Sequence, residues 1–416
     1  TFSYLKQHPV EWFDLEGISA VEATDNHTVT FYLKKPYAPF LNQVAGNVPI
    51  IPRHVWQNVA DPRGTSNVEY MVGTGPYRLI RYDKAQGAYA YQANTNFFLG
   101  APQIEKIFFV PVGDTVAALE RGVIDEGNIP ASLLHRFKDR RDFLIASGPS
   151  YWVLTLRFNC DQQPFSEKAV RQAIACAIDR KALIEQAVPG GLEGAKPGSP
   201  GFLPPDSSWH DSTVQHLYPH DLTRARLLLQ SMGVEDRNGD RICETADGSL
   251  MQFTLITTPQ YLREAEALQL MLRRIGFALQ PKAMDVRSLD ALVREGRFDL
   301  ALAGHGGLGA DPSAIMGFGG MTKRGQSFGV PVDFTYLELS EQLLTSSDRS
   351  QRMELCRTMQ HIYADQLPTL PLYYPIWFSA HRAETLQGWF YTAEGGIGIG
   401  IPLPYNKLLF IRGNLP

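Results

Sequence analysis

Near the middle of the chain, a strand, a helix and a second strand follow one another with short connections. The strand candidates are Gln252–Thr257 and Ala278–Lys282, and the helix between them is Leu262–Ile275. Gly276 follows the helix, at a place where glycine tolerates the left-handed backbone that ends many helices. This order of elements is typical of an α/β layer, so a sheet flanked by helices is predicted.

The pattern of elements changes along the chain. The first third is rich in strand candidates, such as Val29–Leu33 and Ile104–Val110, whereas helices and strands alternate after about Phe158. The periodicity is lost after Trp377, and the glycine-rich segment 395–402 is predicted to be an extended loop. Four side chains are expected to cap helices: Asp114, Ser166, Asp179 and Asp221. The last helix and strand are predicted at Ser350–Asp365 and Pro371–Phe378.

Length and charge exclude several classes of protein. A chain of 416 residues is too long for one ordinary core, which predicts two or three domains. A formal net charge of -4 gives no basic face for nucleic acid or an anionic membrane. No apolar run approaches the roughly 18 residues that cross a bilayer. The motifs of serine hydrolases, zinc proteases and P-loop proteins are also missing, so catalysis is not expected.

The four cysteines do not indicate a metal site. Cys160, Cys176, Cys243 and Cys356 form no C-x-x-C pair and have no histidine at the spacing of a zinc site. Cys176 and Cys356 lie in helical patterns and are expected to be small core residues. The spacing leaves a disulfide among the four open.

One acidic segment has the spacing of a calcium loop. Oxygen-bearing side chains occur at positions 1, 3, 5, 9 and 12 of an EF-hand-like loop: Asp236, Asn238, Asp240, Glu244 and Asp247. Position 6, a glycine in EF-hands, is Arg241, and position 12 is Asp rather than Glu. A structural calcium ion is therefore a candidate, with a plain acidic turn as the alternative. No other cofactor is expected.

Several short motifs occur in an order that one known family shares. They are Val72–Tyr77, Asn94 with Asn96-Phe97, Gly122–Asp125, Phe158-Asn159, Pro164-Phe165, Val170–Asp179, Ala225–Gly233, Phe298-Asp299, Asp311-Pro312 and Leu367–Leu372. Together they resemble the family-5 extracellular solute-binding proteins, which include peptide- and nickel-binding subunits of ABC importers. The resemblance spans nearly the whole chain but lacks the family's N-terminal portion, so Thr1–Lys6 are expected to continue a helix from preceding sequence.

The resemblance implies a fold and a division into lobes. The expected fold is α/β, a two-lobed periplasmic-binding-protein-like fold (type II, cluster C) with mixed sheets, flanking helices and a two-strand hinge. Lobe I is expected to comprise residues 1–159 together with 380–416, and lobe II residues 160–379. Closure of the lobes about the hinge would bury a ligand between them.

The resemblance also implies a function without catalysis. The chain is expected to be the solute-binding subunit of an ABC importer, which captures a peptide-like or other small solute and delivers it to a membrane permease. An enzyme or a ligand sensor built on the same two-lobed fold is the alternative. The protein is expected to be a periplasmic or extracellular monomer without a nucleic-acid partner, associated with the membrane through the transporter. The given chain shows no signal segment.

The two ionic groups that would identify a dipeptide ligand are replaced. Peptide-binding relatives use an aspartate to pair with the ligand's α-amino group, and alignment on Asp311-Pro312 places Leu308 at that position. Dipeptide binders also carry an arginine after the strand equivalent to Gln252–Thr257, whereas the loop here has no cation. A longer peptide held through its backbone, a sugar or a metal complex is therefore a better candidate than a free dipeptide.

Glycines surround one histidine where relatives face their ligand. His305, followed by Gly306 and Gly307, could donate a hydrogen bond or ligate a metal, and the glycines would let a ligand approach the backbone. A structural histidine in a flexible loop is the alternative.

The remaining candidates lie beside the hinge or in loops. Trp152 and Trp377 precede the presumed hinge segments and would offer flat apolar surfaces to a ligand, with core packing as the alternative. Asn47, in the loop before a strand expected at residues 50–52, and Thr258, after the strand Gln252–Thr257, are expected to line the cleft.

Overall fold

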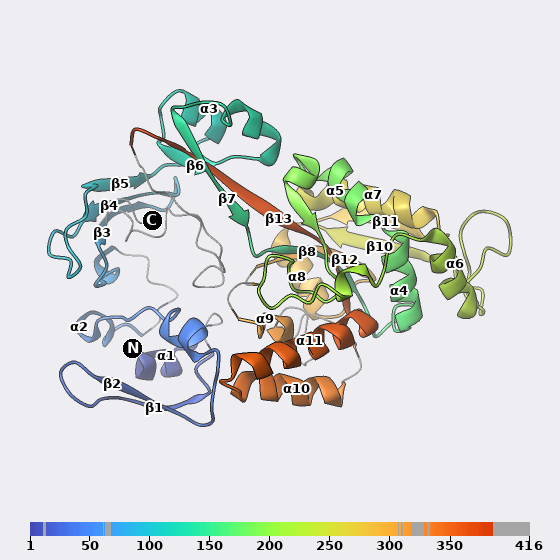
Figure 1. Ribbon diagram of the computed structural model, residues 1–416, viewed down its shortest axis with the longest axis horizontal. Coiled ribbons are helices and arrows are strands. Elements are labelled where there is room, and N and C mark those ends of the chain that lie inside the picture. The colour runs from blue at the N-terminus through green and yellow to red at the C-terminus, as the bar shows by residue number, and fades with distance from the viewer. Residues whose placement is uncertain are drawn as a thin grey trace.

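The structure is a computed structural model that describes residues 1–10, 14–60, 62, 68–306, 308, 311–317, 328–330 and 333–385. It has two lobes joined by the long strand β13 (Thr369–Arg382) (Figure 1). Gly307 and the predicted loop 395–402 lie outside the described residues. In the part of the chain that is described, no helix combines the length and the apolar character that crossing a membrane requires.

The larger sheet is mixed, as predicted. Its strands run in the order β11-β10-β12-β8-β13-β6. The predicted strand–helix–strand unit is confirmed, because β10 (Gln252–Thr257) pairs in parallel with β11 (Ala278–Ala283), and α7 (Leu262–Arg273) connects them. β12 (Leu300–His305) pairs in parallel with β10 and antiparallel with β8 (Val153–Phe158).

Helices cover both faces of this sheet. On one face, Leu154, Leu156 and Phe158 of β8 pack into a core with four helices. These helices are α4 (Lys168–Ala177), α5 (Arg180–Ala187), α6 (Leu222–Ser231) and α7. The other face packs against α8 (Val286–Arg294), α9 (Ala314–Gly317), α10 (Phe334–Thr345) and α11 (Arg349–Gln366) (Figure 1). Cys176 and Cys356 are fully buried core residues, as expected.

Three of the four predicted helix caps are confirmed. The side chains of Asp114, Asp179 and Asp221 accept hydrogen bonds from backbone amides at the starts of α3 (Thr115–Glu120), α5 and α6. The prediction for Ser166 is wrong, because α4 begins at Lys168 and the residue before it, Glu167, makes no capping hydrogen bond through its side chain.

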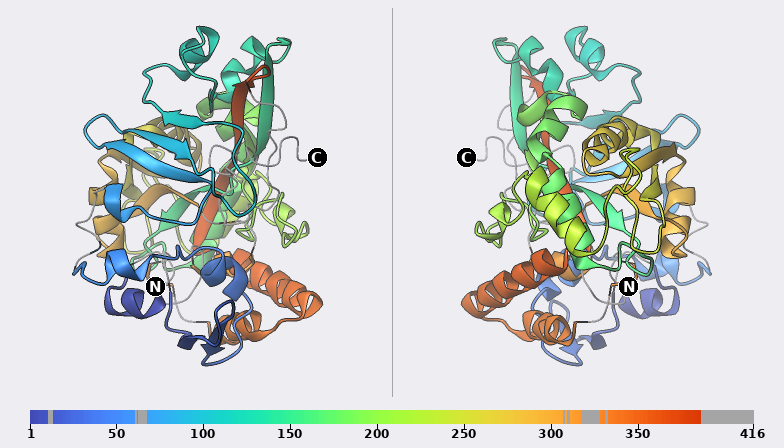
Figure 2. Two further views of the ribbon diagram at one scale, coloured as in Figure 1. Left: turned by 90° about the vertical axis from the view of Figure 1, so that its left-hand side faces the viewer. Right: turned by 90° about the vertical axis from the view of Figure 1, so that its right-hand side faces the viewer.

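Strand β13 belongs to both lobes. Its first half pairs with β8 and with β9 (Ala195–Pro197), whereas its second half pairs with β6 (Glu126–Asn128) and β7 (Phe143–Pro149). The two views of Figure 2 show β13 running from the region of α3 towards α10 and α11.

In the part of the chain that the structure describes, β13 and the short link from β7 to β8 cross between the lobes. These crossings lie at residues 375–376 and 150–152, and they form the two-strand connection that the resemblance implied. The predicted limits at 159/160 and 379/380 lie at the far end of β8 and within the second half of β13. The division of the whole chain into lobes at those limits stays a prediction.

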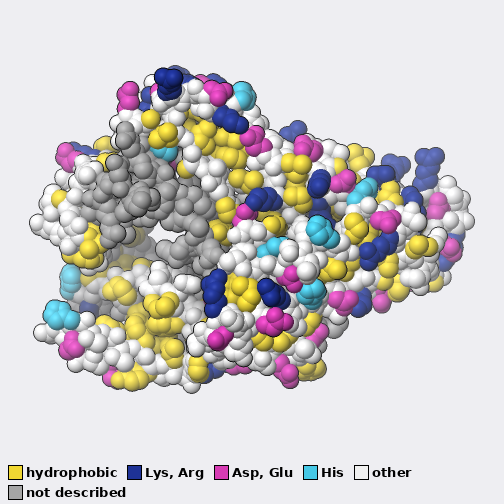
Figure 3. All heavy atoms as spheres, viewed as in Figure 1, with side chains coloured by type: hydrophobic (Ala, Val, Ile, Leu, Met, Phe, Trp, Pro, Cys, Tyr) yellow, Lys and Arg dark blue, Asp and Glu magenta, His cyan; other side chains and the backbone are white. Residues whose placement is uncertain are grey.

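Two smaller sheets lie in the N-terminal part of the described chain. β1 (Ile18–Ala23) pairs with β2 (Val29–Leu33), near α1 (Phe2–Gln7) and α2 (Arg53–Trp56). β3 (Tyr77–Asp83), β4 (Ala88–Ala93) and β5 (Lys106–Phe109) form the other sheet. Figure 3 shows the molecule hollowed between the segment of α1 and α2 and the sheet of β3–β5, with charges of both signs interspersed on this face.

Candidate functional site

The C-terminal end of β12 and the start of β8 meet beside the crossing between the lobes. The indole ring of Trp152 lies against the two glycines that flank His305. A Cβ atom added to Gly304 would lie 2.3 Å from Nε1 of Trp152, and one added to Gly306 would lie 2.7 Å from its Cε3. Only glycine therefore leaves room for the ring at these positions. Trp152 remains 41% exposed, so part of its surface is open to a ligand.

Tyr261 forms a hydrogen bond with the indole of Trp152. The same added Cβ atom at Gly304 would lie 2.6 Å from Oη of Tyr261. Burial raises the pKa of Tyr261, and its hydrogen bond with Trp152 opposes that shift. The predicted residue Thr258 lies at the start of the same turn, where its carbonyl accepts a 3.0 Å hydrogen bond from the amide of Tyr261. Sequence reasoning missed Tyr261, whose contact with Trp152 depends on the pairing of distant strands.

The helix that follows Tyr261 carries a buried carboxylate. Glu264 of α7 is only 4% exposed and accepts a 2.7 Å hydrogen bond from Oη of Tyr373 in β13. Burial raises the pKa of Glu264, and the hydrogen bond from Tyr373 opposes the shift. The pair connects α7 to the strand that crosses between the lobes, so it fixes the position of the turn that carries Tyr261.

His305 contacts a buried arginine. Nη2 of Arg157 lies 3.5 Å from Nδ1 of His305, and Arg157 is 4% exposed. Burial, together with the charge of Arg157, lowers the pKa of His305 well below its usual value of 6.5. The imidazole is therefore neutral at physiological pH and can accept or donate a hydrogen bond without carrying charge.

Two other predicted site residues, Leu308 and Trp377, have surroundings that differ from those of Trp152 and His305. Leu308 is fully buried in a core with Tyr151 and Ile315, and its amide donates a 3.2 Å hydrogen bond to the carbonyl of Tyr151. Trp377 is half-buried on β13, opposite Gly148 of β7.

Asn47 lies in a different part of the molecule from Trp152. It is exposed and follows the short helix Leu41–Ala45, which contacts the start of α9 through a 2.8 Å hydrogen bond from Gln43 to Ser313. A ligand role for any predicted residue stays a prediction.

Asp311, the aspartate of the Asp-Pro motif, is already paired. Its carboxylate accepts hydrogen bonds of 3.0 and 2.8 Å from Nη2 of Arg352 in α11, and both side chains are nearly buried. The pair anchors the segment after β12 to α11. Asp311 is therefore a structural residue in this conformation.

The predicted calcium ligands lie in one loop with many internal hydrogen bonds. Nδ2 of Asn238 donates to Oδ2 of Asp240 at 3.1 Å and to Oε1 of Glu244 at 2.8 Å. Asp236 accepts from backbone amides of the loop, and Asp247 accepts from the amide of Ser249 in the next turn. Within the described residues, no three His, Cys, Asp or Glu side chains are grouped so that they could hold a metal ion. Calcium binding here stays a prediction.

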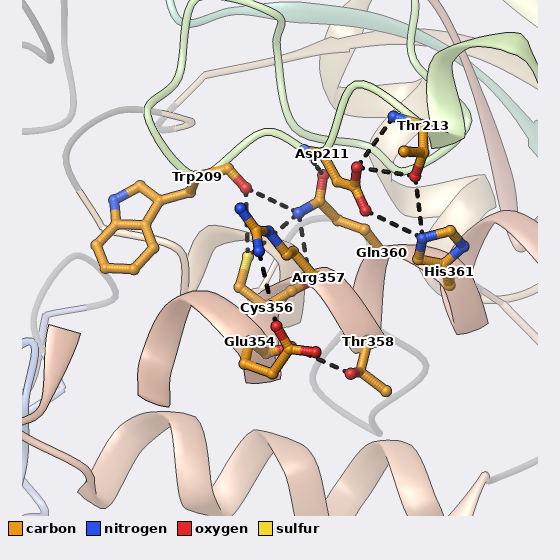
Figure 4. A network of polar contacts seen from close by, with 9 residues as sticks. All are labelled: Trp209, Asp211, Thr213, Glu354, Cys356, Arg357, Thr358, Gln360 and His361. Carbon is orange, nitrogen blue, oxygen red and sulfur yellow. Dashed lines mark hydrogen bonds and ion pairs between the residues drawn. The ribbon is translucent and has the colours of Figure 1, made fainter. Parts of the chain in front are cut away.

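A second polar network joins the segment 209–213 to α11 (Figure 4). Nε2 of His361 lies 3.0 Å from Oδ2 of Asp211 and 3.2 Å from Oγ1 of Thr213. These residue types are those of a hydrolase triad, but both contacts fall on the same ring nitrogen, whereas a triad uses the two nitrogens separately. Gln360 adds a 2.8 Å hydrogen bond to the carbonyl of Trp209. The network fastens the segment to the helix.

Comparisons with known proteins agree with this architecture. Residues 2–325 match the family described as "Bacterial extracellular solute-binding proteins, family 5 Middle". The chain is 26% identical over 402 residues to the oligopeptide-binding protein AppA of Bacillus subtilis, covering 90% of this chain and 70% of AppA. It is 28% identical over 401 residues to the di/tripeptide-binding protein 4 of Pseudomonas aeruginosa, covering 91% and 71%.

Other relatives extend further beyond the matched region, and solved structures share the fold. The chain covers 56% of the length of an ABC transporter peptide-binding protein of Brucella ovis, at 27% identity over 315 residues. It superposes on the structure of Bacillus subtilis AppA in complex with a nonapeptide with a TM-score of 0.76, at 22% identity, covering 98% of this chain and 81% of that one. Because the family match extends over more than half of its length, this chain belongs to family 5 of the bacterial extracellular solute-binding proteins.

Proposed function

We propose that this chain captures a peptide-like solute between its two lobes, as the solute-binding subunit of an ABC importer. The observation that carries the proposal is the position of Trp152. Its partly exposed aromatic ring packs on glycines immediately beside the crossing between the lobes. Membership of the family supports it, as do the relatives whose names describe oligopeptide and di/tripeptide binding.

The geometry favours recognition of the backbone of a peptide. Gly304 lies in β12 and Gly306 directly follows it, and the Trp152 ring fills the space that their side chains would take, so an extended peptide would meet this ring at the end of the strand. Trp152 would cover an apolar side chain of the ligand. Closure about β13 and the 150–152 link would be stabilised by ligand contacts that only the closed state makes.

The partner and location belong to the same proposal. The captured solute would be delivered to a membrane permease, outside the cytoplasm, by a monomeric protein that performs no bond chemistry. An enzyme or a ligand sensor on the same fold is the second candidate, because function depends on the site and not on the fold. Recovery of the peptide unchanged after incubation, together with binding to a permease, separates the importer subunit from both.

The test is native mass spectrometry followed by a thermal-shift screen of peptides, oligosaccharides and nickel or haem complexes. Peptides are expected to raise the melting temperature by several degrees, because a ligand that binds only the folded state stabilises it. Trp152→Ala should lose most of this shift. Phe98→Ala, which removes an aromatic ring that is 77% exposed elsewhere, should keep it. A shift with sugars or metal complexes alone would contradict the peptide ligand.

A further inference from the structure

One buried arginine differs from all the others that the structure describes. Four arginines are buried there: Arg157, Arg171, Arg180 and Arg352. Arg171 donates to the backbone carbonyls of Phe165, Ser166, Gln366 and Leu367 at 2.6 to 3.2 Å. Arg180 donates to the carbonyls of Gly198 and Tyr218, and Arg352 to Asp311 and the carbonyl of Leu343. Each of these three cations has strong acceptors.

Among the residues that the structure describes, Arg157 has no comparable acceptor. Its guanidinium contacts Nδ1 of His305 at 3.5 Å, and its buried Nε has no hydrogen-bond partner among those residues. No carboxylate of a described residue lies within ion-pair distance of Arg157. Asp290 raises the pKa of Arg157 only by electrostatic interaction over a longer distance.

The side chain of Arg157 points towards the crossing between the lobes. In the antiparallel pairing of β8 with β12, Arg157 is opposite Ala301, whereas His305 is opposite Val153. A contact between Arg157 and His305 therefore requires the side chain to run back along β8 towards Trp152. The small side chain of Ala303 lies on this route and leaves space for it.

An unpaired guanidinium at this depth is costly. Removing a cation from water without a counter-charge is strongly unfavourable, and well-packed apolar residues are usually more stable in its place. Burial accordingly lowers the pKa of Arg157 to about 10, which still leaves it fully charged at neutral pH. His305 is neutral and cannot compensate the charge.

We infer that Arg157 and His305 form a subsite for a carboxylate of the ligand, on the face of β8 that leads to Trp152 beside the crossing between the lobes. A carboxylate matches the fork of a guanidinium and can accept two parallel hydrogen bonds. The neutral imidazole of His305 can donate a further one. This subsite lies on β8, and it supplies a cation that the loop after β10 does not contain. The inference rests on the proposed peptide ligand and specifies one of its groups.

The first experiment compares two arginine variants without any ligand. Arg157→Met is expected to keep or raise the melting temperature of the chain, because it removes an uncompensated buried charge. Arg171→Met is the matched control, and it should lower the melting temperature by several degrees, because it leaves backbone carbonyls without donors. A loss in Arg157→Met as large as in Arg171→Met, or its failure to fold, would overturn the inference in favour of a structural role.

The second experiment measures binding of three peptide probes by calorimetry. These are tetra-alanine with a free C-terminus, its C-terminal amide, and the amide of Ala-Ala-Glu-Ala. The wild type should bind the free acid about 10- to 100-fold more tightly than the plain amide, and Arg157→Met should remove this preference. Arg157→Lys should retain only part of it, because an ammonium cannot bind a carboxylate through two parallel bonds. If the amide of Ala-Ala-Glu-Ala binds more tightly than the amide of tetra-alanine, the subsite binds a side-chain carboxylate of the peptide.

The outcomes separate this inference from the proposed function. Equal binding of acid and amide by the wild type, or an unchanged preference in Arg157→Met, would overturn the carboxylate subsite and leave peptide capture intact. If no peptide binds, the proposed function fails, and the subsite is then judged with succinate alone. Thermal stabilisation of the wild type by succinate, absent in Arg157→Met, would still support it, whereas equal responses would overturn it.

Discussion

The backbone amide of Ala38 donates a 2.7 Å hydrogen bond to the carbonyl of Leu344, which ties the N-terminal segment to helix α10. Two side-chain contacts flank it. Gln43 donates a 2.8 Å hydrogen bond to Ser313, and Lys35 forms an ion pair with Glu341 in which both side chains are more than half exposed. Because these contacts lie away from β8 and β13, they hold the segment against α9 and α10 independently of the crossing strands.

Gln43→Ala is expected to loosen this attachment. The change removes a partly buried hydrogen bond, which contributes about 1 kcal/mol, and the amides of residues 37–48 should then exchange faster with deuterated solvent. Lys35→Ala is the control, since so exposed an ion pair contributes only about 0–1 kcal/mol. Unchanged exchange in Gln43→Ala, or equal acceleration in both variants, would contradict the role assigned to Gln43.

Gly304→Ala should displace the indole of Trp152. The new Cβ atom would lie 2.3 Å from Nε1 of Trp152 and 2.6 Å from Oη of Tyr261, so the hydrogen bond between the two rings must break. Overpacking of this kind costs about 1–3 kcal/mol. We expect a change in tryptophan fluorescence that is absent when Trp152 is replaced by Phe in the same background, and weaker peptide binding.

Gly73→Ala is the matched control for that change. A Cβ atom at Gly73 would meet nothing within 4 Å, so both fluorescence and binding should stay at the wild-type level. If Gly304→Ala behaves like Gly73→Ala, the indole does not occupy the position described, and its proposed role as a ligand surface is lost.

Local signals in the sequence were sufficient for many elements. β2 and β10 match their predicted ranges because each is a short apolar run bounded by turn residues. The aspartates before α3, α5 and α6 act as caps because a short carboxylate reaches the free amides of the first turn. Helices α8 and α10 were missed, although Asp285 and Asp333 cap them in the same way.

The site could be predicted only in part, because its contacts join distant strands. His305 and Trp152 were found through the family resemblance, but the contact of Trp152 with Tyr261 depends on the pairing of β12 with β8 on one side and with β10 on the other. Arg157, between buried Leu156 and Phe158, was not singled out, because most arginines lie at the surface. It is buried because α8 and α11 cover that face of β8, which local patterning does not reveal.

The pH dependence of stability should contain a contribution from Glu264. Burial raises its pKa above the ordinary value of 4.5, so the folded protein holds the proton more tightly than the unfolded chain. The stability that this group contributes is therefore fully present below about pH 4.5 and is lost as the pH rises through the raised pKa. Glu264→Gln keeps an acceptor for Tyr373 and should be more stable than the wild type at pH 7 to 8.

Urea denaturation between about pH 4 and pH 8 measures this difference. The gap in unfolding free energy between Glu264→Gln and the wild type should widen as the pH rises. Glu338→Gln, on the exposed face of α10, is the control and should give a constant gap. Parallel profiles for Glu264→Gln and the wild type would mean that the carboxylate of Glu264 is not desolvated.

Arg241→Gly should stabilise the acidic loop, whether or not calcium is present. Arg241 occupies the sixth position of the loop with a φ of 72°, a left-handed conformation that costs a non-glycine residue about 1–2 kcal/mol. Glycine removes this strain but loses more entropy on folding, so the expected net gain is about 1 kcal/mol or less. Gly239→Ala is the opposite control, because Gly239 has a φ of 81° with no neighbour within 4 Å, and it should destabilise the loop.

Melting temperatures measured in EGTA and in millimolar calcium test the effect of Arg241→Gly and the calcium site together. A calcium-dependent rise in the wild type, lost in Asp240→Ala, would support the predicted ligands, whereas equal melting temperatures would leave the loop as an acidic turn held by Asn238 and its backbone amides.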